Sequence, residues 1–142
     1  MERHLWLLVG LFGLLFTVQL VRDDQLLLGV AGGAAFLGVA CWLSPWWRGR
    51  SLRHAEVQPP TGGSRHVVVY WRPGCRYCAR LRWVLRGLPE QVQWVNIWQD
   101  PEAAAFVRGV NGGAETVPTV VVDGAPETNP DPVALRDRLR AC

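Results

Sequence analysis

Lysine is absent from the chain, so arginine supplies all of its positive charge apart from three histidines. The net charge is only +3 over 142 residues, which is too small for a nucleic-acid-binding surface. No stripe of basic residues interleaved with aromatic ones is present, and no nucleic-acid-binding motif is found. We therefore expect no nucleic acid among the partners of this protein.

Cysteine is scarce as well. The four cysteines are Cys41, Cys75, Cys78 and Cys142. A small fold held together by disulfides would need more pairs. A zinc site would need a second pair of ligands, and neither His54 nor His66 has a finger-like spacing to the cysteines. We expect no metal site and no tightly bound cofactor, and we interpret Cys41 and Cys142 as incidental thiols.

Charge is nearly missing from residues 5–47, where Arg22, Asp23 and Asp24 are the charged side chains. They separate two apolar runs, residues 5–21 and 26–47. A helix crosses the hydrocarbon layer with roughly 20 apolar residues, and the many glycines and alanines of the second run allow close helix packing. Residues 1–47 are therefore predicted to form a transmembrane helical hairpin with its turn at residues 22–25.

A cleaved signal peptide is the alternative for the first run. No small-x-small cleavage site follows it, and a second long apolar run does, which disfavours that alternative. Arg3 lies before the first run, and Arg48, Arg50 and Arg53 follow the second. Positive residues favour the cytoplasmic side, so we predict a two-span protein of the cell membrane with its C-terminal part in the cytoplasm.

Residues 48–65 are predicted to be a flexible basic linker, because Pro59-Pro60 and Gly62-Gly63 interrupt regular structure. The domain over 66–142 is predicted to alternate strands and helices. The expected strands are 66–71, 92–98, 119–122 and, more weakly, 126–128, and the expected helices are 76–87, 101–110 and 132–140. This order predicts an α/β domain with one sheet, in which the first two strands are parallel.

Cys75-Arg76-Tyr77-Cys78 follows a predicted strand and opens a predicted helix. This spacing brings two sulfurs within disulfide reach, with the first at the exposed amino end of the helix. The helix dipole stabilises a thiolate there, and Arg72 and Arg76 add positive charge. The motif predicts a redox-active pair; half a metal site and two unrelated core cysteines are the alternatives.

Thr116-Val117-Pro118 precedes the third strand. A cis bond before Pro118 would expose the Val117 backbone to an extended thiol ligand. An ordinary proline at the start of a strand is the alternative, and the sequence leaves the isomer open.

These features resemble the glutaredoxin branch of the thioredoxin superfamily, and mycoredoxins in particular. The resemblance is carried by CRYCARLRWVL (75–85), DPEAAAFVRGVNGGAETVPTVVVDG (100–124) and TNPDP (128–132). It implies a thioredoxin-like fold with a four-stranded mixed sheet, Cys75 as attacking nucleophile and Cys78 as resolving cysteine. The residues it implies for thiol binding are Arg72, Tyr77, Thr116, Val117, Pro118 and Asn129.

The resemblance further implies an enzyme that reduces mixed disulfides between proteins and a low-molecular-weight thiol, or protein disulfides. Mycothiol or a glutathione-like thiol would be the reducing co-substrate, and the partners would be disulfide-containing proteins, membrane proteins among them, and the lipid bilayer. Arg76 stands where the family usually has Gly or Pro, which predicts a more oxidising pair. The alternatives are an exocytoplasmic oxidase or isomerase, an iron–sulfur-cluster-binding glutaredoxin, and an interaction module that brings a partner to the membrane.

Overall fold

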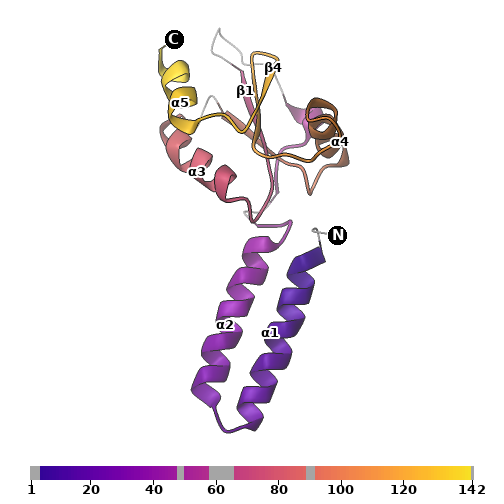
Figure 1. Ribbon diagram of the computed structural model, residues 1–142, viewed down its shortest axis with the longest axis vertical. Coiled ribbons are helices and arrows are strands. Elements are labelled where there is room, and N and C mark those ends of the chain that lie inside the picture. Colours follow the sequence, from indigo (N-terminus) through magenta and orange to yellow (C-terminus); the bar gives the residue numbers. More distant parts are fainter. Residues whose placement is uncertain (1–3, 48–49, 58–65, 89–91, 142) are drawn as a thin grey trace. The chain divides into compact units, whose positions relative to one another are not determined.

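The structure is a computed structural model that describes residues 4–47, 50–57, 66–88 and 92–141 (Figure 1). The chain divides into two compact units, Met1–Gly49 and Arg50–Cys142. Several residues named above, Arg3, Arg48, Pro59-Pro60, Gly62-Gly63 and Cys142, lie outside the described residues.

The first unit is a pair of helices, α1 (Leu5–Arg22) and α2 (Leu26–Leu43), as predicted. By length and composition, both are long and apolar enough to cross a membrane. Small residues lie where the helices meet: a side chain added at Gly13 would collide with Phe36, and one added at Gly33 would collide with Thr17. The rings of Phe12, Phe16 and Phe36 contact one another beside this interface.

The second helix is shorter than the predicted range of 26–47, because it ends at Leu43. Ser44 is extended, with φ −63° and ψ 138°. The ring of Pro45 disfavours helical backbone in the residue before it, which accounts for the early end. Trp46 and Trp47 therefore lie in a turn beyond the helix.

The second unit is built on a four-stranded sheet in the order β2-β1-β3-β4. Its strands are β1 (Val67–Trp71), β2 (Val92–Asn96), β3 (Thr119–Val122) and β4 (Ala125–Thr128). β1 is parallel to β2 and antiparallel to β3, and β3 is antiparallel to β4. The predicted mixed sheet is confirmed, including its weakly marked fourth strand.

Helices cover both faces of this sheet. α3 (Arg76–Val84), continued by the short 3-10 turn η3 (Leu85–Gly87), and α5 (Pro132–Arg140) cover one face, where Leu81, Leu85, Leu135 and Leu139 pack on β1 and β3. α4 (Pro101–Val110) covers the other face, where Ala103, Ala104 and Val107 pack on alternate residues of the same strands. Figure 1 shows α4 across the sheet from α3 and α5.

Residues 50–57 belong to the second unit rather than forming a solvated tether, so the structure differs here from the predicted linker over 48–65. Leu52 pairs with Val95 of β2 as an isolated parallel bridge. The Ser51 hydroxyl donates to the Trp94 carbonyl (3.0 Å) and accepts from the Asn96 N–H (2.8 Å). These bonds satisfy backbone groups on an otherwise open edge strand, which is a physical reason for the segment to dock there.

Candidate active site

The cysteine motif begins where β1 ends and α3 starts. All five residues of β1 are buried, so the strand that leads to the motif is held in the core. Gly74 has a φ of 73°, a conformation that glycine adopts without steric cost. The chain then reaches Cys75, whose Sγ caps α3 by accepting the Cys78 N–H at 3.1 Å. The amino end of a helix carries partial positive charge, so this position favours a thiolate.

Cys75 and Cys78 form a disulfide in the structure, with their Cα atoms 5.3 Å apart. Their surroundings differ. Cys75 is partly exposed at the helix end, whereas Cys78 is only 3% exposed on the buried side of α3. An incoming molecule can therefore reach the first sulfur far more easily than the second.

The Thr116–Pro118 loop lies against the first sulfur. The Val117–Pro118 peptide bond is cis, which answers the question that the sequence left open. The Cys75 Sγ lies 3.6 Å from the Val117 carbonyl oxygen. Pro118 is fully buried, and its carbonyl accepts the Asn129 N–H at 2.8 Å. The structure thus brings Val117, Pro118 and Asn129, predicted from distant parts of the sequence, to the neighbourhood of Cys75.

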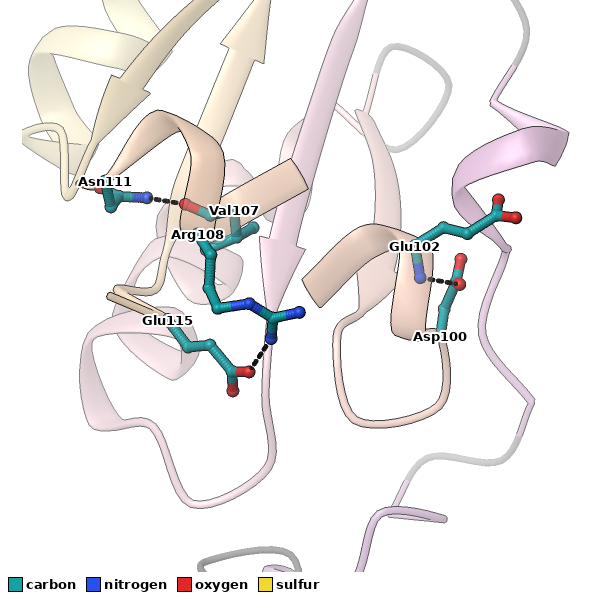
Figure 2. Close-up of polar contacts among 6 residues, drawn as sticks. All are labelled: Asp100, Glu102, Val107, Arg108, Asn111 and Glu115. Carbon is teal, nitrogen blue, oxygen red and sulfur yellow. Dashed lines mark hydrogen bonds and ion pairs between the residues drawn. The ribbon is translucent and has the colours of Figure 1, made fainter. Parts of the chain in front are cut away.

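A polar network that sequence reasoning missed holds this loop. Asn111, at the end of α4, donates to the Val107 carbonyl (2.8 Å, Figure 2) and to the Thr119 hydroxyl (3.1 Å). The Thr119 hydroxyl donates in turn to the Thr116 carbonyl at 2.8 Å. Thr128 on β4 donates to the Asn111 side-chain oxygen at 2.5 Å. No local pattern in the sequence indicates this network, because the partners of Asn111 lie up to 17 residues away in the chain.

Arg72 and Tyr77 are the remaining predicted site residues; Arg72 precedes the motif, and Tyr77 is one of its two variable residues. The Arg72 guanidinium lies over the Trp98 ring, 5.7 Å from its centroid. Tyr77 is 48% exposed on the first turn of α3, and its hydroxyl accepts a hydrogen bond from Arg76 at 3.0 Å. The Arg76 guanidinium also lies 4.9 Å from the Tyr77 ring centroid, so the two variable residues of the motif form one exposed pair.

Residues 50–57 also contact a buried tyrosine, Tyr70, on the side of the sheet that α4 covers. Tyr70 lies in β1, two residues before the active-site loop begins. The Tyr70 hydroxyl lies 2.7 Å from His54 Nδ1, and the His54 N–H donates to the Asp100 carboxylate at 2.6 Å. Asp100 also caps α4 through the Glu102 N–H (Figure 2). Burial, and secondly the charge of Asp100, raises the pKa of Tyr70 to about 12. Tyr70 therefore stays protonated at neutral pH.

Comparison with known proteins supports the family that these features indicate. The glutaredoxin family model matches residues 67–126. A Mycobacterium tuberculosis protein that is named a glutaredoxin is 38% identical over 74 residues, covering 51% of this chain and 88% of that protein. The chain belongs to the glutaredoxin family. Mycoredoxin 1 of Corynebacterium glutamicum is 39% identical over 67 residues, covering 46% of this chain and 81% of the relative.

Family membership makes this protein a thiol–disulfide oxidoreductase with a thioredoxin-like fold. The matched segment holds the cysteine motif and the Thr116–Pro118 loop, whereas the helical hairpin lies outside it. Within the described ranges, no three His, Cys, Asp or Glu side chains gather in a way that could hold a metal ion.

Proposed function

We propose that this glutaredoxin reduces mixed disulfides between proteins and a low-molecular-weight thiol, with Cys75 as the nucleophile and Cys78 as the resolving cysteine. The main support is the difference between the two sulfurs. Cys75 is partly exposed and lies at the amino end of α3, whereas Cys78 is buried one turn further along the helix.

In the proposed reaction, the Cys75 thiolate attacks the small-thiol sulfur of the mixed disulfide. The protein sulfur leaves with the electron pair of the broken S–S bond and then takes up a proton, while the small thiol stays bonded to Cys75. Cys78 then attacks Cys75 Sγ, releasing the small thiol and forming the Cys75–Cys78 disulfide. A second small thiol can attack the same bond instead, forming a low-molecular-weight disulfide.

The groove beside Cys75 is proposed to bind the small thiol through the backbone of Val117, next to Thr116, Pro118 and Asn129. Arg72 and Tyr77 are proposed to flank it. Mycothiol is the proposed co-substrate, because the motifs resemble mycoredoxins and a mycoredoxin is among the relatives. Membrane proteins are among the proposed substrates.

We further propose that residues 1–47 anchor the redox domain, residues 66–142, at the cytoplasmic face of the cell membrane. The support is the pair of apolar helices α1 and α2 and the arginines Arg50 and Arg53 that follow them. Resistance of the full chain to alkaline carbonate extraction tests the anchoring. Labelling of a cysteine placed at the Arg22–Gln25 turn, from outside intact cells, tests the sidedness.

The test of the chemistry is to trap the intermediate with a Cys78→Ala variant. This variant should accumulate a small thiol bonded to Cys75, which intact-mass measurement identifies by its added mass. Mycothiol should be found when the variant is purified from a mycothiol-producing host. A Cys75→Ser variant is the matched control and should carry no adduct at that position; an adduct on Cys78 instead would contradict the assigned roles.

A further inference from the structure

The outer face of α3 combines exposed arginines with an exposed tryptophan. Arg76, Arg80, Trp83 and Arg86 recur at intervals of three or four residues, so they lie along one side of the helix and its 3-10 continuation. Trp83 is 66% exposed, and Arg80 and Arg86 are exposed beside it. We call these four residues the α3 outer face.

This face has no negative charge of its own. Residues 76–87 contain no aspartate or glutamate. Among the described residues, no acidic side chain forms an ion pair with Arg80 or Arg86. By contrast, Arg108 is paired with Glu115 (Figure 2) and Arg138 with Glu127. The α3 outer face therefore presents positive charge around an aromatic side chain.

The segment that follows the hairpin in the sequence is bound at the β2 edge of the sheet. Ser51 is bound to the Trp94 carbonyl of β2. The ring of Trp94 lies under the guanidinium of Arg82 on α3, 3.9 Å from the ring centroid. Trp94 of the edge strand β2 thus contacts both Ser51 and α3.

The length of the intervening chain limits how far this edge can lie from the end of the hairpin. From Leu43, where α2 ends, to Ser51 the chain spans less than about 30 Å even when fully extended. Had residues 50–65 all been a free tether, the limit would have been roughly three times as long. The docked segment therefore shortens the stretch of chain between the end of α2 and the β2 edge.

From these observations we infer that the α3 outer face docks on anionic lipid headgroups, an inference that rests on the membrane anchoring proposed above. Arginines attract anionic lipid, and tryptophan favours the boundary between headgroups and acyl chains. Docking would place Cys75, at the amino end of the same helix, next to the bilayer surface. The enzyme would then act preferentially on disulfides close to the membrane.

The experiment uses the full oxidised chain in lipid nanodiscs whose acyl chains carry bromine, which quenches nearby tryptophan. Subtracting the emission of a Trp83→Phe variant isolates Trp83 from the other tryptophans. We expect the Trp83 emission to be quenched at least about twofold more in discs rich in phosphatidylglycerol than in phosphatidylcholine discs. About 0.5 M salt should remove this difference, because it screens the charges.

A charge-removal pair sharpens the test. Each basic residue near an anionic surface strengthens binding about fivefold, so an Arg80→Gln/Arg86→Gln variant should weaken docking about 30-fold and abolish the Trp83 quenching. An Arg108→Gln/Arg136→Gln variant removes the same charge from α4 and α5 and should leave the quenching intact. Both variants should reduce a small soluble disulfide at the parent rate.

Two readouts separate failure of this inference from failure of the proposed function. A chain that is extracted by carbonate is not anchored, so the proposed anchoring would fail first. A chain that stays in the membrane but shows equal Trp83 quenching in both lipids would overturn lipid docking. A change in the Trp83 emission that appears only when an acidic peptide is added to neutral discs would overturn lipid docking in favour of a protein partner.

Discussion

In the hairpin, the residues buried between the helices are small: Gly13, Gly29 and Ala40. A leucine such as Leu14 is 61% exposed there. In the redox domain the arrangement is reversed, since Leu81 is fully buried in the core. The domain therefore supplies its own apolar environment, whereas the apolar side chains of the hairpin need one from outside, such as a lipid bilayer.

The two units also differ in which of them carries the reactive cysteines. The glutaredoxin relatives match the second unit, and the reactive cysteines lie there. The hairpin holds Cys41 as an exposed free cysteine with no described sulfur partner. If the two units are independent, a change within one should leave the properties of the other unaffected.

Replacing Cys75 by serine should break the chemistry and leave the hairpin unaffected. Without the nucleophilic sulfur, the rate of mixed-disulfide reduction should fall by about a thousandfold or more. Membrane retention should be unchanged, because no residue of the hairpin is altered. A coupled thiol-reduction assay and carbonate extraction of the same preparation measure both properties. A Cys75→Ser variant that worked at the parent rate would refute the proposed role, and a Cys41→Ser variant serves as the control.

Leucine truncations should affect the two units differently. Leu81→Ala leaves a cavity in the core and should lower the free energy of unfolding of the domain by about 2–5 kcal/mol. Leu14→Ala removes a side chain that faces out of the hairpin, so it should leave that free energy unchanged within about 0.5 kcal/mol. Urea unfolding of the detergent-solubilised chain, followed by the near-ultraviolet signal of the domain tryptophans, compares the two. Equal effects would contradict the independence of the units.

The stability of the domain should fall in alkaline solution through Tyr70. Its pKa is raised from 10.0 to about 12 in the folded state, so folding holds the proton more tightly. The resulting stabilisation is fully present below pH 10 and is lost as the pH rises towards 12, by about 2–3 kcal/mol. Unfolding of the oxidised protein between pH 8 and 12 measures this. Tyr70→Phe should remove this part of the pH dependence; an unchanged slope would contradict it.

The smallest expected differences between the two units come from breaking single side-chain hydrogen bonds. Asn111→Ala removes the donor to the Thr119 hydroxyl and the acceptor of the Thr128 hydroxyl, and should destabilise the domain by about 1–3 kcal/mol. The Michaelis constant for the small thiol should also rise, because the Thr116–Pro118 loop loses its support.

Thr17→Val, which removes a bond to Gly13 in the hairpin, should change neither property. Arg108→Gln breaks an exposed ion pair on the same helix as a control, with an effect below about 1 kcal/mol. A parent-like Michaelis constant in Asn111→Ala would contradict the loop-support role.

Most of the fold could be predicted from local patterns. The buried run of β1, the cap and proline that open α4, and the glycines after Asn111 each mark an element boundary within a few residues. The end of α2 was misplaced at residue 47 although its signal, Pro45, was in the sequence. The apolar run continues past the proline, so composition alone extends the expected helix beyond the residue where the backbone restriction ends it. No local pattern indicates that the folded domain begins at Arg50, because Ser51 and His54 act through partners more than ten residues away.

The sequence alone determined the order of the strands and helices, the division into an apolar and a soluble part, and the placement of two cysteines at the start of a helix. These depend on neighbouring residues, whose periodicity and turn preferences are readable along the chain. Only the tertiary structure decided that Val117 lies 3.6 Å from Cys75, that Asn111 supports the loop containing Val117, and that Ser51 and His54 hold the entering chain against the domain. Such contacts depend on the register of the sheet and the packing of its helices, which fix distances between residues that the sequence keeps far apart.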